Sequence, residues 1–287
     1  MKISVQNLCK SYGRREALKG VSFSLTPGIY GLLGPNGAGK STLIGILTGN
    51  LKADSGDVFL NGEDIRKMGA TYRKILGYMP QQQALYPSFT VTGFLDYMAA
   101  LKGMDKSAAR IQIPKVLEEV ELSEYGKSKI KTLSGGMKQR LMIAQAILND
   151  PDFIILDEPT AGLDPKQRIT IRNLVSRIAV NKIVLLATHV VSDVEFIAKE
   201  LILLKEGMIL RKAGKEEILH SMQGYVYEAQ ISIDQYKSLP ESWRIAGVSQ
   251  IAEKVFVRVI TEHPEAAQDC AEVRPTLEDV YLYYFGG

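Results

Sequence analysis

Short apolar runs separated by polar or glycine-rich stretches characterise the N-terminal part of the chain. Residues 3–5 and 17–25 read as strands on either side of a polar turn at 11–15. Residues 29–33 form another apolar run, short enough for a buried strand. Residues 57–62 read as a further strand that ends in an Asn-Gly turn. This part of the chain is therefore expected to consist largely of strands.

The middle of the chain changes to a helical pattern. Three segments have apolar residues at helical spacing and little strand character: 94–102, 107–121 and 135–148. A short apolar run lies before them at 75–78, and strand signals return at 153–156 and 183–187, with a helical segment at 166–179 between them. This strand–helix–strand alternation predicts a parallel sheet.

The pattern shortens again toward the C-terminus. Residues 201–205 and 208–211 flank Glu206-Gly207 and predict a hairpin. Beyond residue 223 come short alternating runs at 226–231 and 255–260 and a final helix at 277–285. A length of 287 residues leaves room for one large domain and a smaller one. We therefore expect a small α+β unit over residues 222–287.

Composition narrows the class of protein. A hydrophobic content of 46% and a net charge of +3 are ordinary for a globular protein, and neither calls for nucleic acid as a partner. No apolar run is long enough to span a bilayer, and the N-terminus lacks the apolar region of a signal peptide. Cys9 and Cys270 are isolated from each other and from the histidines, which favours a reducing cytosol and argues against a zinc site.

A glycine-rich motif follows the apolar run at 29–33 and precedes a helix-like segment. Its pattern is G-x-x-x-x-G-K-[ST], in which glycines let backbone N–H groups point at phosphate oxygens and the helix dipole favours anions. Lys40 would reach the β- and γ-phosphates, and Ser41 would ligate Mg²⁺. The alternative, a glycine-rich turn that binds nothing, does not explain the strand before the motif and the helix after it. The motif consists of Gly34, Pro35, Asn36, Gly37, Ala38, Gly39, Lys40, Ser41 and Thr42.

Two carboxylates end the strand predicted at 153–156. Ligands collect at the carboxyl ends of parallel strands, where the phosphate loop also lies. Asp157 is then placed to hold Mg²⁺, and Glu158 to polarise the attacking water as a general base. A buried strand that ends in solvated acids is the alternative, and it is less convincing behind a phosphate loop.

Three further residues carry weaker signals. His189 ends the strand at 183–187 and can hydrogen-bond the γ-phosphate, although a lone histidine is more often structural. Gln81 follows the strand at 75–78, where its amide oxygen can reach Mg²⁺ or the attacking water. Tyr12 can stack on an adenine ring, but an exposed turn tyrosine without a role is equally consistent with the local sequence.

Two further motifs, Leu133–Arg140 and Ala161–Asp164, lie between the phosphate loop and His189. The order of all these motifs along the chain resembles that in the nucleotide-binding subunit of ATP-binding cassette (ABC) transporters, over roughly residues 1–220. The signature Ser134, Gly135 and Gly136 is the most specific element of the resemblance, and it precedes a helix whose N-terminus can bind an anion. The resemblance implies that Tyr12 stacks on adenine and that Gln81 senses the membrane partner. It also implies that the signature contacts the γ-phosphate of a second cassette, and that Asp164 crosses the dimer interface.

The resemblance implies an α/β P-loop NTPase cassette over residues 1–221, with an antiparallel β subdomain and a helical subdomain at about 83–148. It further implies a peripheral cytoplasmic ATPase with ATP and Mg²⁺ as cofactors, working as a dimer, expected to be a homodimer, with a separate membrane-spanning subunit. The tail at 274–282 resembles cassettes of bacterial drug- or ion-type exporters, which favours export. The aromatic end of this tail, from Tyr281 to Phe285, either forms an interface or packs on the tail's own core. An importer ATPase and an ATP-driven regulatory switch without transport stay open as alternatives.

Overall fold

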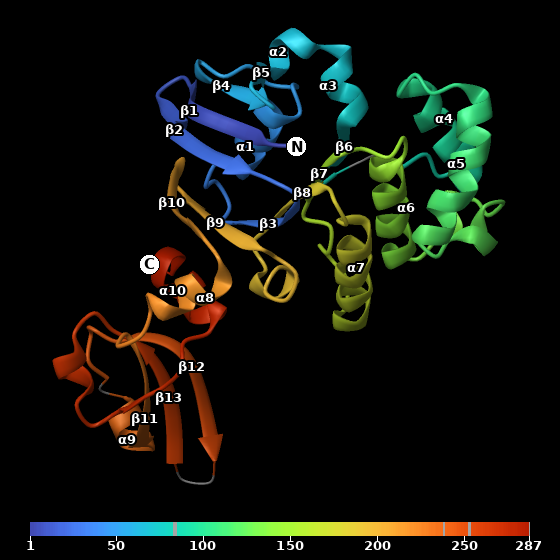
Figure 1. The fold of residues 1–287 in the computed structure, drawn as a ribbon. Helices are drawn as coiled ribbons and strands as arrows, with labels where there is room; N and C mark the ends of the chain where they lie inside the picture. The colour runs from blue at the N-terminus through green and yellow to red at the C-terminus, as the bar shows by residue number, and fades with distance from the viewer. Residues whose placement is uncertain (83–84, 238, 252–253, 287) are drawn as a thin grey trace. The chain divides into compact units, whose positions relative to one another are not determined.

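The fold is described here from a computed structural model that covers residues 1–82, 85–237, 239–251 and 254–286 (Figure 1). The chain forms two compact units, Met1–Lys212 and Ala213–Gly287. The division therefore falls earlier than the boundary after residue 221 that the sequence suggested, and the short helix α8 (Lys215–His220) belongs to the second unit. The start of the predicted helical subdomain, at 83–84, lies outside the described residues.

An antiparallel sheet opens the first unit (Figure 1). Its order is β2-β1-β4-β5, and β1 extends to Tyr12, so that the polar turn is confined to Gly13-Arg14. The Asn61-Gly62 turn connects β4 to β5 as predicted. Two short helices then follow that the apolar pattern did not predict. The elements are β1 (Ile3–Tyr12), β2 (Arg15–Leu25), β4 (Ser55–Leu60), β5 (Glu63–Asp64), α2 (Ile65–Met68) and α3 (Ala70–Ile75).

A second sheet, of order β10-β9-β3-β8-β7-β6, forms the centre of this unit. Strands β6, β7, β8, β3 and β9 pair in parallel, so their carboxyl ends lie at one edge, as the strand–helix–strand alternation predicted. Strands β7 and β8 are buried along their whole length, which explains their continuous apolar sequence. The elements are β3 (Gly28–Leu33), α1 (Lys40–Leu47), β6 (Leu76–Met79), β7 (Phe153–Asp157), α7 (Pro165–Ile178), β8 (Ile183–Thr188), η3 (Val191–Asp193), β9 (Glu200–Lys205) and β10 (Met208–Ala213).

The three predicted helices of the middle segment are present. Thr90 caps α4 by accepting a hydrogen bond from the backbone of Gly93, so the helix begins earlier than its apolar pattern. The ammonium of the half-buried Lys102 donates to the carbonyls of Ala146 and Leu148 at the end of α6, which joins the ends of α4 and α6. The elements are α4 (Val91–Leu101), α5 (Lys106–Glu119), η1 (Ser123–Tyr125), η2 (Ile130–Thr132) and α6 (Gly135–Ile147).

The second unit is built on an antiparallel sheet of order β12-β13-β11-β14. The valines of β13 form its small core, against which Trp243 packs. Asp279, in the tail that resembles exporter cassettes, caps α10 and accepts hydrogen bonds from Arg258 at 2.9 and 2.6 Å. This tail motif therefore fastens the last helix to the sheet. The elements are α8, β11 (Val226–Ser232), α9 (Ile233–Tyr236), β12 (Arg244–Ile251), β13 (Lys254–Ile260), η4 (Pro264–Ala267), β14 (Ala271–Glu272) and α10 (Leu277–Phe285).

The structure was also searched for membrane-spanning helices. Within the described ranges, no helix combines the length and the apolar character needed to cross a bilayer.

Candidate functional site

The glycine-rich loop connects the carboxyl end of β3 to the first turn of α1, as predicted. Two of its glycines are required by close backbone contacts. A side-chain carbon at Gly34 would lie 2.3 Å from the carbonyl oxygen of Leu204. Gly39, at φ +111°, caps α1, and a side-chain carbon there would lie 2.6 Å from the carbonyl oxygen of Ala17. The loop therefore curls tightly between β2 and β9 and leaves the N-terminus of α1 open to an anion.

Lys40 is the first residue of α1, and its side chain is buried. Its ammonium donates to the loop carbonyls of Gly34, at 2.5 Å, and Pro35, at 3.2 Å. Burial lowers the pKa of Lys40, while the nearby carboxylates of Glu158 and Asp157 act in the opposite direction. The ammonium thus lies within the phosphate loop and near both acids.

A cavity of about 460 Å³ adjoins this loop. It brings together residues from the β1–β2 turn, the phosphate loop, the segment after β6 and the end of β7, as the topology of a parallel sheet predicts. Apart from the signature residues and Asp164, the predicted residues that do not line it are Gly34, Ala38 and His189. The cavity is lined by Tyr12, Arg15, Ala17, Pro35, Asn36, Gly37, Gly39, Lys40, Ser41, Thr42, Gln81, Asp157 and Glu158.

The two acids at the end of β7 are both buried, with Asp157 6% and Glu158 4% exposed. Burial, reinforced by the charge of Glu158, raises the pKa of Asp157 to about 6, although Lys40 acts against this shift. Glu158 adopts a left-handed backbone, at φ +51°, and its N–H donates to the carbonyl of Ala187 at 2.9 Å. Such backbone strain in a residue with a side chain is common at functional sites.

His189 directly contacts Glu158. Its Nδ1 lies 2.8 Å from Glu158 Oε1, and the hydroxyl of Thr188 donates to the other carboxylate oxygen at 3.4 Å. A second acid, Asp193, supports this arrangement, because its carboxylate accepts hydrogen bonds from Thr188, at 3.2 Å, and from Thr160. Sequence reasoning missed Thr160 and Asp193, since nothing in their local sequence indicates that both are buried beside Thr188.

Arg15 is another lining residue that the sequence did not point to. It pairs with Tyr12 across the β1–β2 turn, and its guanidinium donates to the carbonyl of Gly37 at 3.3 Å. The sequence motifs pointed to the aromatic residue of this turn, Tyr12, but not to the basic residue paired with it. A basic side chain therefore adjoins the phosphate loop in addition to Lys40.

The signature residues lie outside this cavity. Ser134 caps α6 by accepting a hydrogen bond from the N–H of Met137 at 3.3 Å, and Asp164 caps α7 in the same way through Gln167, at 2.9 Å. Gly136 packs closely on the side chain of Gln167. Ser134 and Gly136 line a separate cavity of about 200 Å³, and Gly135 and Asp164 line neither cavity. Within one chain, the phosphate loop and the signature therefore lie in different pockets.

Ser41, Gln81 and Asp157 provide a suitable donor set for Mg²⁺. Mg²⁺ prefers oxygen ligands and is commonly held by one or two carboxylates together with phosphate oxygens of the substrate. These three side chains line one cavity, and the burial of Asp157 beside Glu158 disfavours a free carboxylate and so favours a cation there. Among the residues that the structure describes, no group of three or more His, Cys, Asp or Glu side chains is arranged to hold a metal ion.

Comparisons with known proteins agree with this geometry. The family described as "ABC transporter" matches residues 18–161 of the chain. The uncharacterised ABC transporter ATP-binding protein YxlF of Bacillus subtilis is 37% identical, covering 98% of both chains. The Nod factor export ATP-binding protein I of Paraburkholderia xenovorans is 35% identical, covering 99% of this chain and 97% of the relative.

A solved structure is similar as well. It is the dimeric post-hydrolysis state of the ATP-binding cassette MJ0796 bound to ADP and Pi. It superimposes with a TM-score of 0.66 and 28% identity, covering 74% of this chain and 98% of the cassette. The chain thus belongs to the ABC transporter family and carries the ATPase cassette of that family.

Proposed function

We propose that the chain hydrolyses ATP at the interface between two cassettes and thereby drives the export of a solute through a separate membrane-spanning subunit. The observation that carries this proposal is the contact between Glu158 and His189, at 2.8 Å, beside the cavity that also contains Lys40 and Asp157. A buried carboxylate oriented by a histidine next to a phosphate loop is suited to activate a water for attack on a phosphoryl group.

The lining residues divide the chemistry of hydrolysis among them. Tyr12 stacks on the adenine ring, and the loop from Gly34 to Thr42 surrounds the phosphates, with Lys40 on the β- and γ-phosphates. Ser41, Gln81 and Asp157 would hold Mg²⁺, which neutralises charge on the phosphate oxygens. Glu158 accepts the proton of the attacking water. His189 orients Glu158 through Nδ1, which leaves its Nε2 for the γ-phosphate.

The second cassette is needed because one chain contains only half of each site. Ser134 and Gly136 line a different cavity from Lys40, so they contact a nucleotide only across an interface with another chain. Gly135 and Asp164 belong to the same surface through their positions at the starts of α6 and α7. The dimeric form of the similar cassette MJ0796 supports this arrangement, with two copies of this chain as the proposed homodimer.

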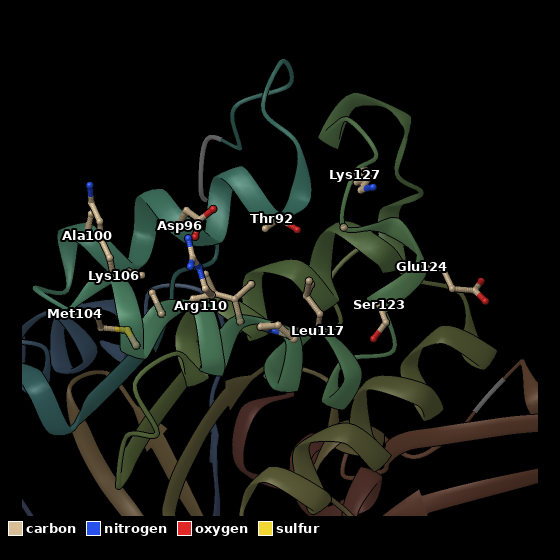
Figure 2. Close-up of a pocket in the computed structure, with 15 residues that line it drawn as sticks. Thr92, Asp96, Ala100, Met104, Lys106, Arg110, Leu117, Ser123, Glu124 and Lys127 are labelled. Carbon is tan, nitrogen blue, oxygen red and sulfur yellow. The ribbon is translucent and has the colours of Figure 1, made fainter.

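The helical segment supplies a surface for the membrane-spanning subunit. Tyr86, Phe89 and Tyr97 are 43%, 36% and 39% exposed and pack on one another, with ring centroids 5.0 to 6.0 Å apart. This segment also has a cavity of about 860 Å³ between α4, α5 and residues 123–127 (Figure 2). The three aromatic residues do not line this cavity, and exposed aromatic residues that pack on one another are themselves suited to receive an apolar helix. The chain would then lie on the cytoplasmic face of the membrane.

The direction of transport rests on the relatives. The name of the Paraburkholderia xenovorans relative refers to export, and that protein is covered almost completely by this chain. Import and a regulatory ATP switch without transport are the competing functions. Co-purification from membranes distinguishes a transporter ATPase from a regulatory switch, because only the transporter ATPase is expected to be recovered with a membrane-spanning subunit.

Loss of the phosphate-loop ammonium tests the proposed site. Lys40→Ala should reduce the rate of ATP hydrolysis to background, because phosphoryl transfer depends on positioned charge. Lys67→Ala is the control, since Lys67 is an exposed lysine of the same unit that does not line the cavity. An unchanged rate in Lys40→Ala would contradict the assignment.

A further inference from the structure

A further cavity in the first unit is not explained by ATP hydrolysis. It has a volume of about 480 Å³ and lies between α1, the loop after it, β4 and the short helices α2 and α3. It shares no lining residue with the phosphate-loop cavity, whose α1 residues come from the opposite end of that helix. Its size falls within the range of about 300–1,000 Å³ that is usual for small-molecule sites.

The floor of this cavity is apolar. Leu8, Ile46, Val58, Ile65 and Tyr72 are all buried and belong to the main hydrophobic core of the unit. The two buried hydroxyl groups at the floor are already satisfied within the protein. Tyr72 donates to the carbonyl of Leu47 at 2.6 Å, and Thr48 donates to the carbonyl of Gly45 at 3.2 Å. The five apolar side chains of the floor are only 0–6% exposed, so the apolar surface that remains for a ligand is that of the half-buried Leu51 and Ala53, which pack against the core and also line the cavity.

The rim of the cavity is basic. Its charged residues are Lys52, Arg66, Arg73 and a single acid, Asp57. Arg66 is neutralised twice, because it forms ion pairs with Asp57 and, at 2.7 Å, with Asp64. Lys52 and Arg73 are exposed, and neither forms an ion pair with any residue in the described part of the chain. Two unneutralised cations thus adjoin an apolar floor.

We propose that this cavity binds a small amphipathic anion, with its apolar chain on Leu51 and Ala53 and its phosphate or carboxylate head between Lys52 and Arg73. Charge complementarity identifies the head group, because the only acid on the rim is already paired. The half-buried Leu51 and Ala53 identify the chain, since an ion without an apolar part would gain nothing from their surface.

Dodecyl phosphate, titrated below its critical micelle concentration into the full chain, is the probe that tests this. Calorimetry should show saturable binding of one molecule per chain. Excess ATP with Mg²⁺ should leave this binding unchanged, whereas displacement by ATP would place the probe in the phosphate loop and overturn the proposal. Inorganic phosphate and the neutral dodecyl maltoside should bind at least tenfold more weakly, because each lacks one of the two required parts. Binding of dodecyl maltoside as tight as that of dodecyl phosphate would also overturn it.

Two sets of variants locate the site. Lys52→Glu with Arg73→Glu should weaken binding of dodecyl phosphate by at least about tenfold, since charge-assisted hydrogen bonds to the head are lost. Lys67→Glu with Lys74→Glu is the matched control, with the same charge change on exposed lysines outside the cavity. Affinity equal to that of the unmodified chain in the first double variant would contradict the proposal.

A cavity-filling variant keeps the test independent of charge. Ala53→Phe places a ring beside the apolar floor and should reduce binding of dodecyl phosphate while ATP hydrolysis continues. The chain should not co-sediment with vesicles that contain an anionic lipid. If it does, and Lys52→Glu with Arg73→Glu abolishes the co-sedimentation, the basic rim binds membrane headgroups, and the small-molecule site is wrong. ATP binding should also be measured on the same variants. A variant that binds ATP but not dodecyl phosphate then separates the cavity proposed here from the ATP site of the proposed function.

Discussion

The imidazole of His189 lies with its Nδ1 2.8 Å from Oε1 of Glu158, and this contact joins the ends of the neighbouring strands β7 and β8. Glu158 is buried at the edge of the phosphate-loop cavity, whereas His189 is half exposed. The imidazole therefore restricts the carboxylate to one orientation while its other edge stays accessible. Under the proposed function, the Glu158 carboxylate would then be held as the general base for the attacking water.

Removing the imidazole should affect the chemical step more than nucleotide binding. We expect His189→Ala to lower kcat by up to about 10²–10⁴-fold, the usual contribution of a general base, because Glu158 loses the group that orients it, while KM for ATP changes little. His263→Ala, which removes an exposed histidine of the second unit, is the control. Steady-state ATPase kinetics check this, and a variant that changes KM alone would show that His189 acts in binding.

Asp157 should reduce the stability of the protein in the absence of metal and nucleotide. Its folded pKa of about 6 lies above the ordinary value, so the folded state holds the proton more tightly than the unfolded chain. Stability should therefore fall as pH rises from about 4 to 6 and stay lower above that range. Asp157→Asn should then gain about 3 kcal/mol of unfolding free energy at pH 8 and almost nothing at pH 4.

Denaturant unfolding in EDTA measures this difference. Asp152→Asn, an exposed aspartate just before β7, provides the comparison and should change stability little at either pH. The gain in Asp157→Asn should accompany loss of ATP hydrolysis. Equal stability of the variant and the unmodified chain at pH 8 would show that burial of Asp157 is not costly.

The exposed aromatic residues of the helical segment should matter for the membrane-spanning subunit and not for the ATP site. Phe89→Glu should abolish co-purification with that subunit, because the glutamate cannot pack in an apolar interface, while basal ATPase activity is retained. Val180→Glu introduces the same charge at another exposed apolar position and should not interfere. Loss of folding in Phe89→Glu would indicate instead that the residue is part of the core.

In the tail, Asp279 should stabilise the second unit without affecting nucleotide binding. Burial would raise the pKa of Asp279, but hydrogen bonds from Arg258 and Thr276 outweigh it and hold the pKa below its ordinary value. This contribution is present above the ordinary pKa and is lost as pH falls through the lower folded value. Asp279→Ala leaves Arg258 without its carboxylate partner and should cost about 3–5 kcal/mol.

Limited proteolysis shows which of the two units loses stability in this variant. Asp279→Ala should make residues after 213 more susceptible to cleavage, whereas affinity for ATP should stay unchanged. Glu278→Ala, at the exposed neighbouring position, is the control. A large loss of ATP affinity in Asp279→Ala would show that the tail supports the cassette rather than its own unit.

Sequence patterns predicted the strands that carry the candidate site well, because the physical cause of those patterns is local. Strands β7 and β8 are buried on both faces, so each is a continuous apolar run that ends at a polar residue. Strand β12 was missed because it lies at the edge of its sheet and is largely exposed, which leaves little apolar pattern. The short helices α2 and α3 were missed because four and six residues are too few to show a helical repeat of apolar positions.

Contacts within the site could be predicted only in part. Parallel strands place Asp157, Glu158 and His189 at one edge, but the pairing of Nδ1 with Oε1 depends on side-chain orientation and on the left-handed backbone of Glu158. The burial of Asp193 and Thr160 depends on packing between segments that are distant in sequence. Such relationships carry no local signal.

The central claim, that two chains share each ATP site, is tested most directly by the mass of Glu158→Gln in solution. This variant keeps the shape of the carboxylate but removes the base, so ATP should stay bound and hold two cassettes together. Light scattering after gel filtration with ATP and Mg²⁺ should show a mass about twice the 31.7 kDa of one chain. Addition of Ser134→Glu should return the mass to that of one chain. A Glu158→Gln protein that binds ATP stoichiometrically but keeps the mass of a single chain would contradict the account.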